Sequence, residues 1–195
     1  HYRRISQESF GQEIMFEDQD ILDIYHEGGK EEYAFNLLVR KYQERLYWHI
    51  RQLVLDHEQA NDLLQNTLVK AWRYLPDFRG DSKLFTWLYK IATNETLTYL
   101  KRERLKSFIS LSNWDDKIGR QLLADEYFNG DELQMALHKE IQKLPPKQRT
   151  VFTMRYFDEM KYEDMVEILG GTEGSLKASY HHAYNKIKEN LKRQF

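Results

Sequence analysis

Residues Phe78 to Lys106 read FRGDSKLFTWLYKIATNETLTYLKRERLK and predict a loop that runs into a long helix rich in rings and basic side chains. Pro76 to Asp81 favour the loop, because proline and glycine interrupt regular structure. Ser82 is the predicted N-cap, since a serine hydroxyl accepts a hydrogen bond from the first helical turn. We expect the helix to continue to about Arg104, with a buried stripe at helical spacing formed by Leu84, Leu88 and Ile91.

This stretch has the composition of a surface that binds nucleic acid with unstacked bases. Flat rings offer faces on which bases stack, and the stretch contains several, among them Phe78, Phe85, Trp87 and Tyr89. Cations can follow a phosphate backbone, and the stretch supplies Arg79, Lys83, Lys90, Lys101 and Arg102. The alternative is a core helix with a solvated charged face, which the apolar stripe fits equally well.

The composition predicts an all-helical protein. The chain has 195 residues with only 3 prolines and 9 glycines, which leaves little room for many short strands and turns. It has no cysteine, so disulfides and thiolate metal sites are excluded, as is typical of a reducing cytoplasm. No apolar run approaches the roughly 20 residues of a membrane span. We therefore expect a cytoplasmic protein without membrane insertion.

The net charge of −2 conceals an uneven distribution. Residues 67–106 hold 9 basic and 4 acidic side chains. Residues 135–195 hold 11 basic and 8 acidic side chains. Residues 1–66 and 107–134 are acidic instead, with net charges of −6 and −4. Two basic segments separated by an acidic connector predict two surfaces that face a polyanion.

Periodicity and capping signals predict the other helices. In the first half they cover residues 18–27, 31–55 and 57–74, the last capped by Asp56 and with Trp72 on its buried side. In the second half they cover residues 133–144, 146–156, 162–169 and 173–191. The period is lost over residues 107–132, apart from a short return near 118–123. This acidic segment is predicted to be a linker, anchored by Trp114 or simply solvated.

The last two helices favour a helix-turn-helix, in which the second helix enters a major groove. Gly170-Gly171-Thr172 forms the tight turn, and the following helix is basic toward its end. A plain helical hairpin is the alternative. In the groove-binding interpretation, the side chains that face base edges are Ser175, Lys177, Ala178, His181 and His182, of which Ser175, Ala178 and His182 share one face.

Five ordered motifs together resemble the sigma factors of bacterial RNA polymerase, specifically the compact extracytoplasmic-function (ECF) group. This group keeps only the second and fourth conserved regions. The motifs are AFNLLVRKY at residues 34–42, DLLQNT at 62–67, FRGDS at 78–82, TWLYKIATN at 86–94 and LPPKQR at 144–149.

The resemblance implies two small helical domains joined by a flexible acidic linker. The expected parts are an N-terminal extension over residues 1–20, sigma region 2 over 21–106, the linker over 107–132 and sigma region 4 over 133–195. The expected function is to bind core RNA polymerase and direct promoter recognition, DNA melting and transcription initiation. The implied partners are core RNA polymerase, promoter DNA and an anti-sigma protein. The linker is expected to thread a basic channel of the polymerase.

The resemblance also implies roles for individual residues. Core-polymerase binding falls to Asp62, Gln65 and Asn66. A second set is implied to bind the minus-ten element, including a base flipped out of the duplex. Its members are Phe78, Arg79, Ser82, Trp87, Lys90, Asn94, Lys101 and Arg102. Binding of the minus-thirty-five element falls to Ser175, Lys177, Ala178, His181 and His182, with Arg149 on the phosphate backbone.

One motif departs from the family pattern. Where the family often has VKSRLHRAR, this chain has LKASYHHAY, which places Ser179, His182 and Tyr184 at arginine-rich positions. Each lost phosphate contact lowers the salt dependence of binding. We therefore expect weaker and less salt-sensitive binding to the upstream element.

An enzyme and a stand-alone regulator are the two other function classes. No phosphate-binding GxxxxGK, no GxSxG and no HExxH occurs, and no two histidines are three or four residues apart, so we expect no catalysis, no metal site and no cofactor. A stand-alone helix-turn-helix regulator would share residues 161–192. Such a regulator would not need the ring-rich basic helix.

Overall fold

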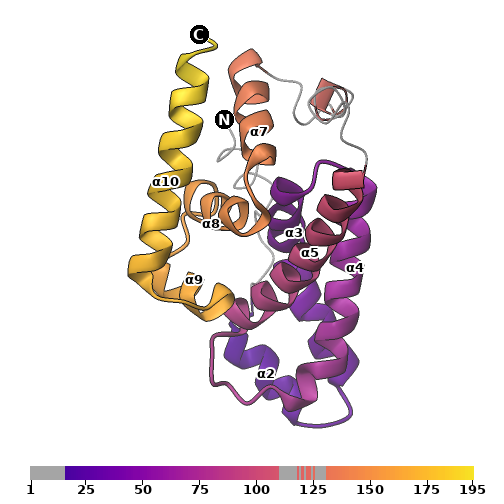
Figure 1. Cartoon of the computed structure of the whole chain (residues 1–195). Coiled ribbons are helices and arrows are strands. Elements are labelled where there is room, and N and C mark those ends of the chain that lie inside the picture. The colour runs from indigo at the N-terminus through magenta and orange to yellow at the C-terminus, as the bar shows by residue number, and fades with distance from the viewer. Residues whose placement is uncertain (1–15, 110–117, 119, 121, 124, 126–130) are drawn as a thin grey trace. The chain divides into compact units, whose positions relative to one another are not determined.

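The computed structural model describes residues 16–109, 118, 120, 122, 123, 125 and 131–195, and every regular element in them is helical (Figure 1). The elements are α2 (Asp18–His26), α3 (Glu31–Leu53), α4 (His57–Tyr74), the 3-10 turn η1 (Leu75–Asp77), α5 (Leu84–Ile109), α7 (Glu132–Lys143), α8 (Pro146–Tyr156), α9 (Tyr162–Leu169) and α10 (Glu173–Lys192). The predicted all-α fold is confirmed. Among these helices, none is long and apolar enough to cross a membrane.

The chain divides into two compact units, residues 1–44 and 45–195. In the first unit, Asp18 at the start of α2 fastens that helix to α3. Its carboxylate accepts a hydrogen bond from Lys41 Nζ at 2.7 Å and from the Tyr42 hydroxyl at 2.8 Å. After α2, Gly28 and Gly29 have φ of +80° and +75°, a left-handed geometry that glycine adopts without strain.

In the second unit, α4 begins where the sequence predicts. Asp56 caps it, because its Oδ1 accepts a hydrogen bond from the Glu58 amide at 2.8 Å. Its buried face is formed by Ala60, Leu63, Thr67 and Ala71, and α4 packs along α5. The prediction that Trp72 lies on the buried side is wrong, since 45% of it is exposed.

Helix α5 begins two residues after the predicted cap. The Trp87 amide donates to the Lys83 carbonyl at 3.0 Å, which makes Lys83 rather than Ser82 the N-cap. The helix also continues to Ile109, beyond the predicted end at Arg104. The first two residues of the predicted loop, Pro76 and Asp77, belong to the 3-10 turn Leu75–Asp77.

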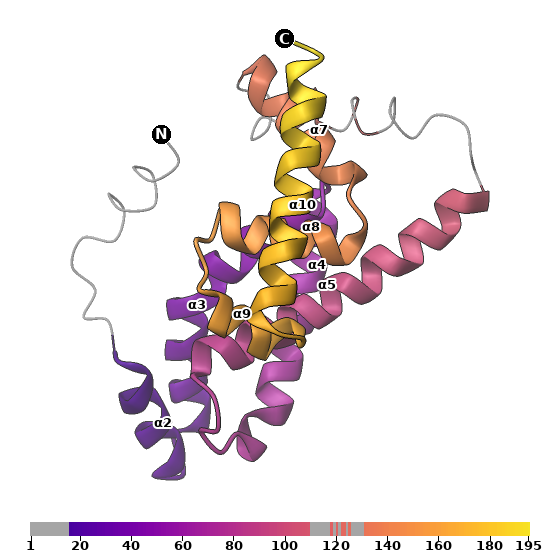
Figure 2. The same ribbon diagram turned by 60° about the vertical axis from the view of Figure 1, so that its left-hand side comes forward.

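Helices α7, α8 and α10 pack around a core of Ile141, Leu144, Phe152, Ala183 and Ile187. Helix α10 contacts α7, α8 and α9, and Figure 1 shows α7 beside the C-terminal half of α10, a pairing that Figure 2 shows from another side. Pro145 and Pro146 mark the start of α8, because proline at the first helical position loses no hydrogen bond.

The described residues of the connecting segment are not a solvated tether. Residues 118, 120, 122 and 123 are helical, as predicted. Ile118 and Leu122 are buried and pack against Leu55 and Met135. Trp114, the predicted anchor, lies outside the described residues, and the predicted domain boundaries stay a prediction.

The buried carboxylate of Glu140 ties the end of α10 to α7. It accepts hydrogen bonds from Asn190 at 2.8 Å, from Gln194 at 3.1 Å and from Lys143 at 3.0 Å. Burial opposes ionisation of Glu140, but these donors outweigh burial and lower its pKa below the ordinary value.

We predict that Glu140→Gln lowers the free energy of unfolding by about 1 to 2 kcal/mol at pH 7, because the three donors lose a charged acceptor. A carboxyl with a lowered folded-state pKa stabilises the fold above its ordinary pKa of 4.5 and loses that contribution as pH falls through the lowered value. The difference between wild type and variant in urea unfolding should therefore shrink in acid. Glu189→Gln, at an exposed position of α10, is the matched control. A deficit independent of pH would contradict this account.

Candidate functional site

The predicted polymerase-binding residues lie on one exposed face of α4. Asp62, Gln65 and Asn66 are all exposed. At 100° per residue, Val69 and Trp72 fall on the same face, and they are 58% and 45% exposed. The face thus combines polar side chains with two large apolar ones, a composition typical of protein interfaces. Sequence periodicity missed Trp72, because it also fits the edge of the apolar stripe.

The four rings of the loop and helix are less exposed than predicted. Phe78 is only 9% exposed, and its ring lies 5.1 Å from that of half-buried Trp87. Tyr89 is 3% exposed, and its hydroxyl donates to the Arg45 carbonyl. Burial raises the pKa of Tyr89, with nearby Asp158 adding to the effect. Phe85 is half-buried beneath the Arg45 guanidinium, which lies 4.8 Å from the ring centre. Trp87 is therefore the predicted site ring best placed to meet a base.

The polar members of the predicted minus-ten site form a continuous stripe on α5. Lys90, Asn94 and Lys101 are exposed, and with Trp87 they fall within about 60° around the helix. We call these four residues the α5 stripe. Arg102 is exposed at its edge, whereas Arg79 is exposed and Ser82 half-buried in the preceding loop. The helix thus offers one ring, one amide and two cations along a single line.

The predicted groove-reading residues of α10 are exposed but occupy two neighbouring faces. Ser175, Ala178 and His182 share one face, and Lys177 and His181 lie on its flank. Ser175 has a structural task as well. Its hydroxyl donates to the Thr172 carbonyl at 2.8 Å and accepts from the Thr172 amide at 3.1 Å, while Thr172 Oγ1 accepts from the Ser175 amide. This capping box fixes the start of α10.

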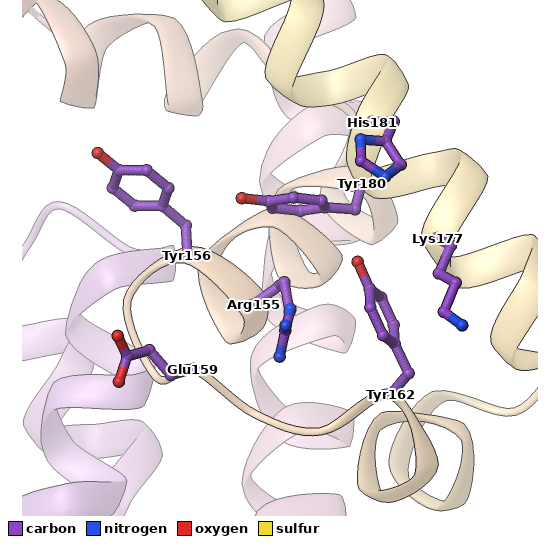
Figure 3. Close-up of a pocket in the computed structure, with 7 residues that line it drawn as sticks. All are labelled: Arg155, Tyr156, Glu159, Tyr162, Lys177, Tyr180 and His181. Atoms are coloured by element: carbon purple, nitrogen blue, oxygen red, sulfur yellow. The ribbon is translucent and has the colours of Figure 1, made fainter.

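The α10 flank borders a pocket of about 620 Å³ that sequence reasoning missed (Figure 3). Tyr162 stands between two cations, with Arg155 4.9 Å and Lys177 5.5 Å from its ring centre. Arg155 is held in place by donating to the Met160 carbonyl at 2.9 Å. The remaining lining residues are Tyr156, Glu159, Tyr180 and His181. The pocket therefore offers rings and cations beside the predicted DNA-reading helix.

Arg149 is placed differently from its predicted role on a phosphate. It is 6% exposed, and its guanidinium donates to the carbonyls of Leu53, Gln142 and Leu144 at 3.1, 2.7 and 3.2 Å. Burial, helped by Arg104, lowers its pKa to about 10, so it stays charged at neutral pH. A phosphate contact requires the guanidinium to leave these carbonyls. Within the described ranges, no cluster of three or more His, Asp or Glu residues could hold a metal ion.

Comparison with known proteins identifies two family regions in the chain. The model of Sigma-70 region 2 matches residues 38–106, and that of Sigma-70, region 4 matches residues 134–187. The RNA polymerase sigma-H factor of Pseudomonas aeruginosa is 32% identical over 183 residues, which cover 90% of this chain and 94% of that protein. The ECF RNA polymerase sigma-E factor of Haemophilus influenzae is 28% identical over 182 residues, or 89% and 95% of the two chains.

Two solved structures share the fold. The sigma factor RpoE in complex with the anti-sigma factor NepR from Bartonella quintana has a TM-score of 0.60 and 24% identity, over 81% of this chain and 96% of that one. CnrH in complex with the cytosolic domain of CnrY has a TM-score of 0.66 and 21% identity, over 91% of this chain and 99% of that one.

The capping box gives a test of how the groove-reading helix is held. We predict that Thr172→Ala lowers the free energy of unfolding by about 1 kcal/mol, because the first amides of α10 lose their acceptor. Urea unfolding of the full chain measures this change. Ser179→Ala, further along the same helix, is the control and should be close to neutral. Equal unfolding midpoints for Thr172→Ala and wild type would rule the box out as a stabilising element.

Proposed function

We propose residue-level roles for this chain, which belongs to the extracytoplasmic-function (ECF) sigma factors and directs transcription initiation. In this proposal it binds core RNA polymerase, places its C-terminal domain on upstream duplex DNA and holds a melted strand with α5. The observation that carries the proposal is the α5 stripe, in which half-buried Trp87 lies in line with the exposed side chains of Lys90, Asn94 and Lys101. The matches to Sigma-70 region 2 and region 4 support the proposal that the chain has a surface for each of these partners.

The exposed face of α4 is the proposed polymerase-binding surface. Asp62, Gln65 and Asn66 supply polar contacts, and Val69 with Trp72 supplies apolar area that a partner can bury. Buried tryptophan is among the residues that contribute most to protein interfaces. In the complex, burial of Trp72 removes a large exposed apolar ring from water.

The α5 stripe and the preceding loop are the proposed minus-ten site. Flipping a base out of a duplex costs a few kcal/mol, and stacking on a ring returns about 1 to 3 kcal/mol per base. Trp87 supplies the exposed part of the ring pair, and Asn94 supplies an amide that can both donate to and accept from a base edge. Lys90, Lys101 and Arg102 follow the phosphates, while Arg79 and Ser82 act from the loop.

The exposed faces of α10 are the proposed minus-thirty-five site. Ala178 and His182, with Ser175 at the capped start, face the bases, and Lys177 and His181 approach from the flank. Arg149 contacts a phosphate in this proposal only after it leaves the carbonyls that now hold it. The upstream contact is therefore the less charged of the two DNA-binding surfaces.

The remaining proposals follow from family membership. We propose that a protein inhibitor binds this chain, because one solved structure with a similar fold is a sigma factor in complex with an anti-sigma factor and another is CnrH in complex with the cytosolic domain of CnrY. We propose that the chain acts in the cytoplasm, where its polymerase works, and has no catalytic activity of its own. The stand-alone regulator is not favoured, because it leaves the α5 stripe and the α4 face without a purpose.

The minus-ten proposal predicts that Asn94→Ala lowers the rate of promoter opening at least tenfold when purified core polymerase is present. Asn94 is exposed, so the variant should keep its helical circular dichroism. Thr98→Ala, one turn further along α5 and also exposed, is the matched control. Permanganate reactivity of unpaired thymines measures the opening. Unchanged opening by Asn94→Ala would contradict the proposed role. Phe78→Ala is a poorer probe, because removing a nearly buried ring also costs about 3 to 5 kcal/mol of stability.

The upstream proposal predicts a shallow dependence of binding on salt. Lys177→Ala should reduce the slope of log K against log salt concentration by about 0.9, the value for one phosphate contact. Fluorescence anisotropy of holoenzyme on a labelled upstream duplex measures this slope. Lys161→Ala, which removes the same charge from an exposed position before α9, is the control. An unaltered slope for Lys177→Ala would remove this residue from the phosphate-binding set.

A further inference from the structure

One exposed amide on α10 has no task within the fold. Asn185 lies in the interior of the helix and is exposed, and its side chain forms no hydrogen bond with another described residue. Asn190, further along the same helix, is half-buried and donates to the Glu140 carboxylate at 2.8 Å. Asparagine is a poorer helix former than alanine, lysine or glutamate, so an exposed asparagine without a partner adds no stability to a helix. The amide of Asn185 is therefore available to a ligand outside the chain.

Asn185 extends the base-facing side of α10 by one turn. At 100° per residue, it falls about 20° from Ala178 and about 60° from His182 around the helix axis. The segment from Ser175 to Asn185 rises by about 15 Å, which corresponds to about four base-pair steps of a duplex. A helix that lies along a major groove can therefore present both ends of this segment to base edges.

The spacing of the exposed residues on α10 matches a known way of reading a major groove. His181, His182 and Asn185 follow Ala178 by three, four and seven residues, and all four are exposed. Homeodomains, which are also helix-turn-helix proteins, place the base-contacting residues of their recognition helix at the same spacing. The last position of this pattern in α10 is Asn185.

The chemistry of an asparagine amide selects adenine in a major groove. Its carbonyl oxygen accepts a hydrogen bond from the adenine N6 amino group, while its amino group donates to N7. Guanine presents two acceptors there, so it leaves the amide oxygen without a donor. Helix α10 contains no arginine, the residue that most often pairs with guanine. The base-facing side of α10 thus has an adenine reader at Asn185 and lacks the usual guanine reader.

We propose that Asn185 reads an adenine at one edge of the minus-thirty-five element. This inference rests on the proposed role of α10 at the upstream duplex, and it adds a residue and a base to that role. An uncharged amide releases no counterion when it binds, so Asn185 contributes to base preference and not to the salt dependence of binding. Its loss should change the preferred base at one position and leave the salt slope unaltered.

Selection from a promoter library tests this inference. Holoenzyme assembled from core polymerase and the full-length chain is allowed to bind a library that is randomised over the upstream element, and the bound DNA is sequenced. The wild type should enrich adenine at one edge of the selected element. Asn185→Ala should reduce that enrichment by about fivefold or more at this position alone, and Asn185→Arg should change the preferred base there to guanine.

Two controls separate base reading from folding. Asn36→Ala removes the same amide from an exposed position of α3 and should leave the base frequencies unchanged. Urea unfolding of Asn185→Ala should have a midpoint equal to or above that of the wild type, because alanine is the better helix former. A change of the preferred base to guanine in Asn185→Arg is a gain that misfolding cannot produce.

Identical base frequencies for the wild type and Asn185→Ala would overturn the inference. A lower salt slope for Asn185→Ala without a change in base frequencies would also overturn it, since that result would assign the residue to the backbone. If the wild-type holoenzyme selects no upstream sequence, the proposed role of α10 fails. If His182→Ala alters the selected sequence and Asn185→Ala does not, the role of α10 stands and only the role of Asn185 fails.

Discussion

The guanidinium of Arg149 is the contact on which the arrangement of the C-terminal helices depends. It joins the last turn of α3 to the turn between α7 and α8 by donating to the carbonyls of Leu53, Gln142 and Leu144. Its Nε is buried and lacks a hydrogen-bond partner among the described residues, which costs about 1 to 3 kcal/mol. The same group therefore links these elements and leaves one of its own donors unsatisfied.

This packing leaves the proposed working surfaces exposed. The α4 face, both faces of α10 and three members of the α5 stripe, Lys90, Asn94 and Lys101, are exposed while α5 lies against α8 and α9, and Trp87 is half-buried.

Local signals in the sequence were enough to predict most helix boundaries. Asp56, Pro146 and the Gly170-Gly171 pair act on their own backbone, and the helices begin or end beside them. The sequence did not reveal features that depend on distant partners. Arg149 turns inward because a carbonyl 96 residues away accepts from it, and the Tyr162 pocket forms only when α8, α9 and α10 meet. The family motifs supplied the candidate site, while the exposure of Trp72 and the burial of Phe78 had to come from the packing.

In the proposed function, the α5 stripe holds a melted DNA strand. Thr98 lies on the same side of α5, is exposed and has no assigned role, so a photo-crosslinking benzoylphenylalanine can replace it without removing a predicted contact. In a complex of the chain, core polymerase and a promoter, irradiation should join this position to the unpaired strand of the minus-ten element. Crosslinks that form only to duplex DNA, or that form equally without core polymerase, would contradict the account.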